Sequence, residues 1–203
     1  MNLKCGNLEI IIGPMFSGKT SKLLNIITTR ADILWNIEKK INVLLILYNK
    51  FERKVNKSFN GITTHFSGFK ESSNRIEIKR TDLLKNINVE KYKIIGIDEG
   101  QFFSDLDIEV KKWIFNGKDV IISSLDGDYN LNKFGKVLNL VPLCIKISKE
   151  KAVCLYCLKN NIYKEASFTI RTSKEREQIQ LGGMDKYLPV CLQCHREYTK
   201  KNY

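Results

Sequence analysis

The chain has 203 residues, of which 43% are hydrophobic and 28% are charged, and its formal net charge is +12. This apolar content excludes disorder for most of the chain, since disordered segments lack the hydrophobic residues that offset the loss of chain entropy. The apolar runs fall far below the roughly 18–20 residues that cross a bilayer, and no secretory signal is visible. These features predict a cytoplasmic protein with no membrane partner.

The excess of Lys and Arg makes an anionic partner a candidate, and nucleic acid, a membrane surface and a nucleotide polyphosphate all carry the required charge. The basic residues are spread along the chain rather than gathered in a block, which argues against a polybasic tail. Codon bias toward Lys, Asn and Ile would give the same composition. The charge alone therefore does not choose a partner.

Short apolar runs alternate with helix-spaced patterns through most of the chain. Strands are predicted at 8–12, 43–47, 62–66, 75–79, 93–97, 120–123 and 144–147, and helices at 19–30, 83–87 and 106–114. Strands that alternate with helices indicate an α/β fold whose mostly parallel sheet is covered on both faces. The composition changes at about Lys149, which predicts one domain over residues 1–149 and a smaller one over 150–203.

The first predicted strand leads into a sequence that matches G-x-x-x-x-G-K-[ST] at every fixed position. In this motif, backbone N–H groups surround phosphates, the Lys reaches the β- and γ-phosphates and the Thr hydroxyl binds Mg²⁺. The next helix points its positive N-terminus at the same anion. The predicted ATP- and Mg²⁺-binding residues of this loop are Gly13, Pro14, Met15, Phe16, Ser17, Gly18, Lys19 and Thr20.

Two carboxylates, Asp98 and Glu99, follow the predicted strand at 93–97. Ligands of open parallel sheets bind at the carboxyl ends of the strands. An Asp at this place in phosphoryl-transfer folds holds Mg²⁺, directly or through water, which leaves Glu99 to act as a base. The alternative is a solvated acidic pair that only caps the strand, and the phosphate loop upstream favours the functional interpretation.

Four cysteines form two Cys-x-x-Cys pairs, Cys154 with Cys157 and Cys191 with Cys194. In a chain without a signal peptide this spacing indicates zinc rather than disulfides. Four thiolates leave no open position on Zn²⁺, so a structural role is predicted rather than a catalytic one. His195 is an alternative ligand, and four free buried thiols are the remaining alternative.

Aromatic and glycine residues surround the predicted phosphate site. Gly182 and Gly183 allow close backbone approach to a ligand, and Tyr187 offers an aromatic face with a hydroxyl. Other aromatic residues follow the acidic pair or flank a polar turn: Phe102, Phe103, Tyr129 and Phe134. A single aromatic residue is more often part of a core, but this set indicates stacking on a flat base.

The motifs together resemble the type II thymidine kinases, the zinc-containing cytosolic kind. The resemblance rests on GPMFSGKT at 13–20, IGIDEGQFF at 95–103, LDG at 125–127, LNLVPL at 138–143 and GGMDKY at 182–187, and it runs from about residue 8 to 195. It implies a RecA-like P-loop core with a C-terminal zinc-binding lasso domain. It further implies a homotetramer that transfers the γ-phosphate of ATP to the 5′-hydroxyl of thymidine or deoxyuridine and is inhibited by thymidine triphosphate.

The resemblance also implies roles for individual residues. Glu99 falls on the general base and Asp98 on the Mg²⁺-linked acid, whereas Gln101 and Arg53 fall near the ATP phosphates and metal. Phe102 matches the aromatic residue that packs on the thymine ring. The other implied nucleoside-binding residues are Tyr129, Phe134, the lasso arginine Arg171, the closing tyrosine Tyr187, and Gln178, Ile179, Gln180, Leu181 and Gly182, whose backbone would read the base edges.

Two positions depart from the pattern of the family. Phe51 stands where many members carry an Asp, which puts a polar contribution there in doubt, and Tyr129 stands where a Phe is common.

Two other functions stay open at this point. One is a P-loop ATPase that binds nucleic acid through a zinc ribbon, and the other is a purely structural zinc protein, which leaves the phosphate loop unexplained. A nucleic-acid ribbon would carry Lys and Arg clusters with aromatic residues, whereas the segment 174–177 reads Lys-Glu-Arg-Glu and is nearly neutral. A nucleoside kinase without a nucleic-acid partner is the favoured interpretation.

Overall fold

The computed structural model describes residues 5–49, 73–173, 175–180 and 182–202. Its central sheet has six strands in the order β3-β2-β4-β5-β1-β6, and every pairing between neighbours is parallel. The strands are β1 (Leu8–Ile12), β2 (Val43–Tyr48), β3 (Ile76–Thr81), β4 (Ile94–Ile97), β5 (Asp119–Ser124) and β6 (Lys146–Lys149). The predicted α/β fold with a mostly parallel sheet is confirmed.

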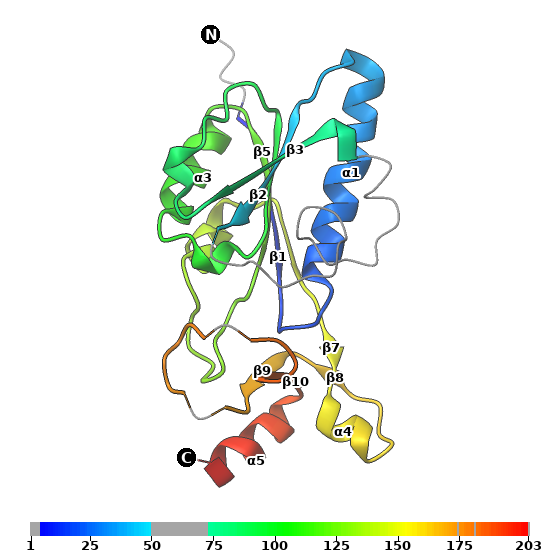
Figure 1. Cartoon of the computed structure of the whole chain (residues 1–203), viewed down its shortest axis with the longest axis vertical. Helices are drawn as coiled ribbons and strands as arrows, with labels where there is room; N and C mark the ends of the chain where they lie inside the picture. Colours follow the sequence, from blue (N-terminus) through cyan, green and yellow to red (C-terminus); the bar gives the residue numbers. More distant parts are fainter. Residues whose placement is uncertain (1–4, 50–72, 174, 181, 203) are drawn as a thin grey trace.

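Helices cover the two faces of the sheet (Figure 1). Helix α1 (Lys19–Glu38) packs on one face together with Leu45 of β2, whereas helix α3 (Leu106–Phe115) packs on the other face together with Leu44. Successive strand residues thus enter different hydrophobic cores. This explains why the strands read as continuous apolar runs rather than as alternating patterns.

Three predicted elements differ from the observed ones. Helix α1 continues eight residues past its predicted end, because nothing breaks the helix before Lys39, which adopts φ 54° and donates its N–H to the Trp35 carbonyl. Strand β6 lies two residues later than predicted. The helix predicted at 83–87 is wrong: Leu84–Asn86 is a short 3₁₀ turn. The strand predicted at 62–66 lies outside the described residues.

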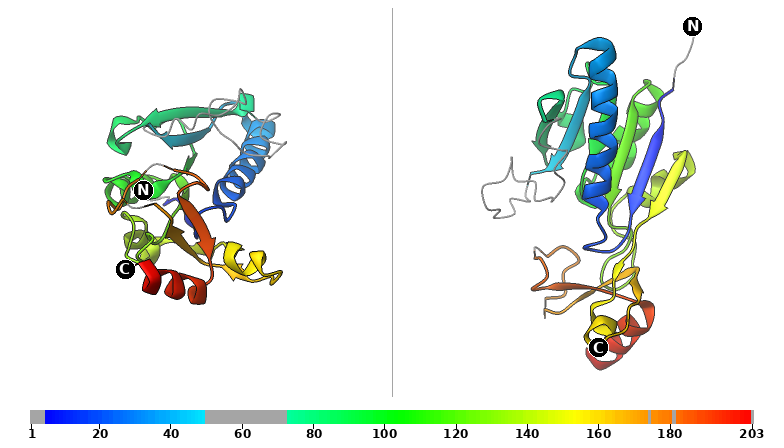
Figure 2. Two further views of the ribbon diagram at one scale, coloured as in Figure 1. Left: turned by 60° about the horizontal axis from the view of Figure 1, so that its bottom comes forward. Right: turned by 90° about the vertical axis from the view of Figure 1, so that its right-hand side faces the viewer.

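A smaller unit lies at the carboxyl ends of the sheet strands (Figures 1 and 2). It contains the hairpin of β7 (Ala152–Val153) and β8 (Glu165–Ala166), the hairpin of β9 (Phe168–Arg171) and β10 (Tyr187–Val190), and the helices α4 (Leu155–Lys159) and α5 (Leu192–Asn202). Its own core combines two of the cysteines with Ala166, Ile170 and Val190. The domain boundary between residues 149 and 150 stays a prediction.

In the part of the chain that the structure describes, no helix has both the length and the apolar character that crossing a bilayer requires.

Candidate active site

A cavity of about 700 Å³ lies between the carboxyl ends of the sheet strands and the smaller unit. The predicted site residues that line it are Met15, Phe16, Ser17, Gly18, Lys19, Thr20, Asp98, Glu99, Gln101, Phe102, Tyr129, Phe134, Arg171, Gln178, Ile179, Gln180, Gly182 and Tyr187. Gly13 and Pro14 belong to the same loop without lining the cavity, and Arg53 and Leu181 lie outside the described residues. One cavity therefore gathers nearly all of the described candidates.

The phosphate loop has the backbone conformation that its glycines allow. Gly13 has φ 144°, and a Cβ atom there would lie 2.5 Å from the carbonyl oxygen of Glu150. Gly18 adopts the left-handed conformation, with φ 79°, as the N-cap of α1. The Lys19 amine donates to the Pro14 carbonyl at 2.6 Å, so the side chain folds back over the loop. The loop thus places an ammonium group and a helix N-terminus at one place, where both favour an anion.

The hydroxyl of Thr20 and the carboxylate of Asp98 lie next to this loop. Thr20 Oγ1 donates to Asp98 Oδ1 at 3.0 Å, and Ser123 of β5 also donates to Oδ1. Strand β5 lies between β1 and β4 in the sheet, so Asp98 receives hydrogen bonds from the phosphate loop and from the neighbouring strand. Carboxylate and hydroxyl oxygens suit Mg²⁺.

Glu99 leaves the sheet in an uncommon backbone conformation. Its φ is 55° and its ψ is 45°, which is left-handed and unfavourable for a residue with a side chain. Gly100 follows, where a Cβ atom would lie 2.7 Å from a methyl carbon of Ile122. Gln101 Nε2 donates to Glu99 Oε2 at 2.7 Å. The chain thus turns sharply, and Glu99 faces the same cavity as Asp98.

Phe102 forms a flat apolar wall of the cavity. Its ring stacks on Tyr48 with centroids 5.4 Å apart and meets Phe134 edge to face at 5.5 Å. The neighbouring Phe103 is fully buried in the hydrophobic core and does not line the cavity. Of the two adjacent phenylalanines, only Phe102 is therefore available to a ligand.

The loop that joins β9 to β10 closes the other side of the cavity, and Arg171 holds its backbone. Arg171 is 1% exposed. Its guanidinium donates to the carbonyl oxygens of Glu177 and, at 3.0 Å, Gln178, and to the Tyr187 hydroxyl at 2.8 Å. The Tyr187 hydroxyl in turn donates to the Gln180 carbonyl at 2.8 Å. Arg171 therefore fixes the shape of the loop.

Within the described residues, at least four hydrogen bonds join the smaller unit to the core. The Gln178 amide donates to Asp128 at 2.8 Å, and the Tyr129 hydroxyl donates to the Arg176 carbonyl at 2.7 Å. The backbone N–H of Met15, in the phosphate loop, donates to the Thr169 hydroxyl at 3.0 Å. The fourth contact is between His195 Nε2 and the Tyr129 carbonyl, 2.9 Å apart.

Sequence reasoning missed five residues that line the cavity: Ser21, Leu125, Gly127, Asp128 and Thr169. Leu125 and Gly127 belong to the LDG motif at 125–127, which supported the family resemblance without giving these residues a role. An isolated Thr in a strand carries no signal, and only tertiary contacts place Asp128 and Thr169 at the site.

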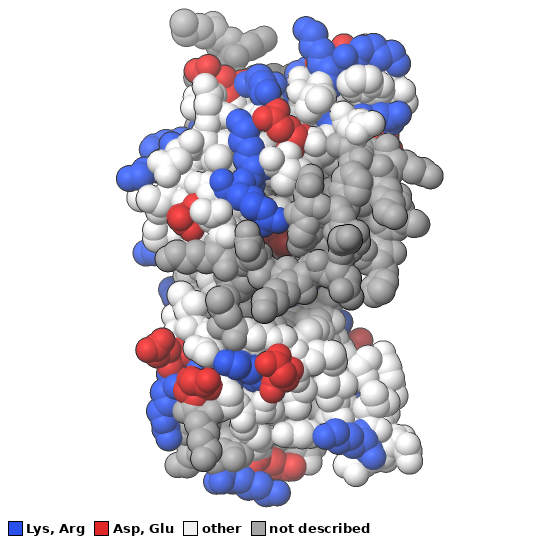
Figure 3. All heavy atoms as spheres, in the orientation of Figure 1, with Lys and Arg blue, Asp and Glu red and all other residues white. Residues whose placement is uncertain are grey.

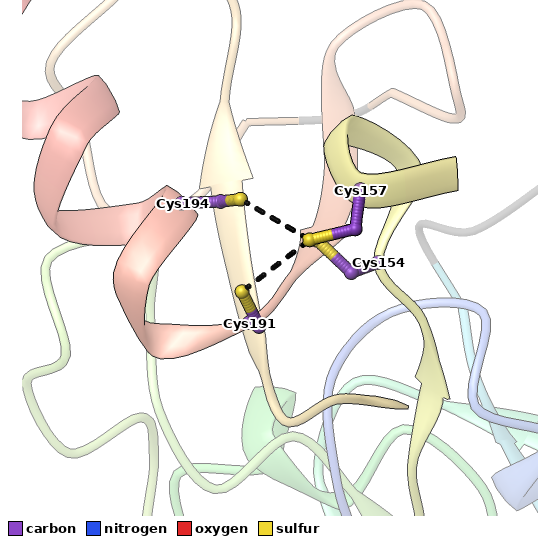
Figure 4. A group of neighbouring side chains, drawn as sticks. All are labelled: Cys154, Cys157, Cys191 and Cys194. Carbon is purple, nitrogen blue, oxygen red and sulfur yellow. Dashed lines mark hydrogen bonds between the residues drawn. The ribbon is translucent and has the colours of Figure 1, made fainter. Parts of the chain in front are cut away.

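The four cysteines come together as predicted, and their sulfur atoms cluster around one point (Figure 4). All four sulfurs lie within 4.8 Å of one another, and Cys157 Sγ lies 3.6 Å from Cys194 Sγ and 3.9 Å from Cys191 Sγ. A tetrahedral site with Zn–S bonds of 2.3 Å has edges of about 3.8 Å. The spacing of the thiols therefore fits Zn²⁺.

The surroundings of the cysteines affect how readily each thiol ionises. Burial opposes ionisation of Cys154, but backbone hydrogen bonds from Cys157 and Cys191 and the neighbouring thiols lower its pKa to about 7. Burial, followed by contacts with neighbouring thiols, raises the pKa of Cys157 and of Cys194. A divalent cation would stabilise all four as thiolates. His195 is not among the clustered ligands, and its ring is buried against Phe168.

Comparisons with known proteins agree with one another. A family model described as thymidine kinase matches residues 6–195. The thymidine kinase of Amsacta moorei entomopoxvirus is 40% identical over 192 residues, which cover 93% of this chain and 97% of that protein. The thymidine kinase of Choristoneura biennis entomopoxvirus is 37% identical over 199 residues, or 97% and 100% of the two chains. The cytosolic thymidine kinase of Gallus gallus is 37% identical over 192 residues, or 94% and 77%.

Proposed function

The chain belongs to the thymidine kinase family, and from this premise we propose that it transfers the γ-phosphate of ATP to the 5′-hydroxyl of thymidine or deoxyuridine. The observation that carries the proposal is the single cavity in which a phosphate loop, an acidic pair and an aromatic wall meet. An ATP-dependent nucleoside kinase needs these three parts within reach of one another, since both substrates must be aligned for transfer.

The phosphate end would work mainly by positioning and charge. Lys19 would neutralise charge on the β- and γ-phosphates, and Thr20 with Asp98 would hold Mg²⁺, directly or through water. Phosphoryl transfer has a loose transition state, so these contacts supply most of the rate. Glu99 would accept the proton that the attacking hydroxyl loses, because the charge of Asp98 is committed to the metal.

The nucleoside end would hold a flat base between the Phe102 ring and the backbone of the loop before β10. A nucleoside has no phosphate of its own, so stacking and hydrogen bonds must supply its binding energy. The residues proposed to contact or enclose it are Phe102, Tyr129, Phe134, Gln178, Ile179, Gln180, Leu181, Gly182 and Tyr187. Arg171 also lines this end of the cavity, and because its guanidinium donates to the backbone of the loop and to Tyr187, it would hold the loop in shape around the nucleoside.

The four cysteines would hold one structural Zn²⁺ per chain. The distances between their sulfurs support this assignment, as does the small core that surrounds them. Zinc would tie α4 to the start of α5 and thereby fix the two ends of the segment that carries Arg171 and Tyr187.

Assembly, regulation and location are carried over from the family resemblance. We propose a homotetramer that thymidine triphosphate inhibits, located in the cytoplasm, as the names of the vertebrate cytosolic relatives suggest. The proposal includes no nucleic-acid partner. On the face shown in Figure 3, Lys and Arg are interspersed with Asp and Glu rather than gathered into one basic patch, which does not favour binding to a polyanion.

The test is a phosphorylation screen of the common deoxyribonucleosides with ATP and Mg²⁺. We expect thymidine and deoxyuridine to give 5′-monophosphates and the purine nucleosides to give none. The nucleic-acid alternative predicts no nucleoside phosphorylation and an ATPase activity that single-stranded DNA or RNA stimulates. That result would replace the proposed function.

A further inference from the structure

We propose that Gln101 is a positioning residue that fixes the Glu99 carboxylate for proton abstraction, instead of binding ATP or Mg²⁺ itself. The inference rests on the proposed role of Glu99 as the general base. It assigns to Gln101 a task different from the one that the family resemblance implied.

The orientation of the Gln101 amide follows from its neighbours. The backbone N–H of Leu125 can only donate, and it lies 2.9 Å from Gln101 Oε1. The Ser124 hydroxyl lies 3.0 Å from the same oxygen. Oε1 must therefore face these two groups, and the NH₂ group must face Glu99. The contact of 2.7 Å between Gln101 Nε2 and Glu99 Oε2 is thus a donation to the carboxylate.

This orientation disfavours a direct role for Gln101 in metal binding. An amide side chain binds Mg²⁺ through its oxygen, and the oxygen of Gln101 is engaged by Leu125 and Ser124, at the end of β5. Using it for a metal would take this acceptor away from the part-buried backbone N–H of Leu125, which is unfavourable. The arrangement suits a side chain that is anchored to the end of β5 and holds the Glu99 carboxylate in a fixed position relative to that strand.

The surroundings hold Gln101 in place. Its side chain is 4% exposed, and Ser124 is fully buried. Gly135 has φ 67°, and a Cβ atom there would clash with the Gln101 carbonyl oxygen. Because Gln101 is buried and its backbone is closely packed, its amide has little freedom to move. The hydrogen bond to Glu99 therefore favours one position of the Glu99 carboxylate. The backbone of Glu99 is left-handed, which is unfavourable for a residue with a side chain. A hydrogen bond from Gln101 helps to hold that side chain in one orientation.

The experiment measures single-turnover rates of thymidine phosphorylation and the KM for ATP for Gln101→Met and Gln101→Glu. Met removes the donor, so we expect the rate to fall roughly 10- to 100-fold. Glu keeps an acceptor for Leu125 but replaces the donor by a charge that repels the Glu99 carboxylate, so the rate should fall at least as far. The KM for ATP should change less than about twofold in both variants, because the chemical step and not ATP binding loses a contact.

Two further variants distinguish a wrong assignment of Glu99 as the general base from a wrong assignment of Gln101 as its positioning residue. Ser124→Ala leaves Leu125 as a donor to Gln101 and should keep the rate within about threefold of wild type. Glu99→Gln should lose most of the rate. If Glu99→Gln stays active, the proposed general base is wrong. If it is inactive while both Gln101 variants keep the wild-type rate or raise the KM for ATP, only the positioning role is wrong. Thermal unfolding of each variant identifies a loss of rate caused by loss of fold.

Discussion

The two ends of the cavity are built in different ways. The phosphate end is built around one continuous segment, residues 13–20, in which glycine geometry and a helix N-terminus determine the shape, and Asp98 joins it through Thr20. The nucleoside end combines Phe102, Tyr129 and Phe134 with a loop from the smaller unit, and hydrogen bonds between distant segments hold it together. Local backbone geometry therefore determines the first end, whereas tertiary contacts determine the second.

This difference predicts how the two ends respond to damage. A change at the phosphate end should affect chemistry without disturbing nucleoside binding. A change in the smaller unit should affect nucleoside binding and leave ATP binding nearly intact. Within the described residues, a hydrogen bond from the Met15 N–H to Thr169 connects the phosphate loop to the smaller unit directly, and a single neutral bond of this kind is worth about 1 kcal/mol.

The largest effect is expected from Lys19→Ala. The change removes the ammonium group that would meet the transferred phosphoryl group, so turnover should fall by roughly 10³-fold or more. Thymidine binding, measured by titration, should change less than about threefold. Lys112→Ala is the matched control, since Lys112 pairs with Glu109 on α3 away from the cavity. Near-normal turnover of Lys19→Ala would show that the loop is not the phosphate site.

Glu99→Gln should come next. The amide keeps the shape of the side chain but cannot accept the proton, so turnover should fall by roughly 10²–10⁴-fold while both substrates still bind. Rates of thymidine phosphorylation and nucleotide titrations check this prediction. A variant that loses ATP binding instead would mean that the roles of Asp98 and Glu99 are reversed.

A smaller and more selective effect is expected from Arg171→Lys. Lysine keeps the charge but loses the planar fork that donates to several carbonyl groups at once. The KM for thymidine should rise about 10- to 100-fold, and the KM for ATP should stay within about threefold of wild type. Arg196→Lys on α5 is the control, since Arg196 is exposed. An equal rise of both KM values would contradict the division between the two ends.

The sequence was enough to predict the residues of the phosphate end, whereas it predicted only part of the nucleoside end. The sequence predicts β1, the phosphate loop and the acidic pair, because each depends on neighbouring residues. The cysteine cluster was predicted as well, because the spacing of metal ligands is a local signal. The role of Arg171 was not, since a single Arg in a strand does not reveal that it will be buried behind a loop.

The misplaced elements have similar causes. The 3₁₀ turn at Leu84–Asn86 receives its cap from Asp105, whose carboxylate accepts the N–H groups of Leu84 and Lys85 at 3.1 and 2.9 Å. The sequence of the segment does not indicate that its hydrogen-bond partner, Asp105, lies some 20 residues away in the chain. Asp128 was missed for the same reason, because its contact with Gln178 spans 50 positions in the chain.

The central claim is that the smaller unit, fixed by zinc, shapes the nucleoside end of the cavity and not the phosphate end. The most direct test is titration of Cys191→Ser with thymidine and, separately, with a non-hydrolysable ATP analogue in Mg²⁺, alongside metal analysis. Cys144→Ser is the control, because Cys144 lies outside the four-cysteine cluster. We predict about one Zn²⁺ per wild-type chain and less in the variant. The dissociation constant for thymidine should rise at least about tenfold, a loss of roughly 1.4 kcal/mol, and that for the ATP analogue should change less than about threefold. Equal weakening of both ligands, or active wild-type protein without zinc, would contradict the account.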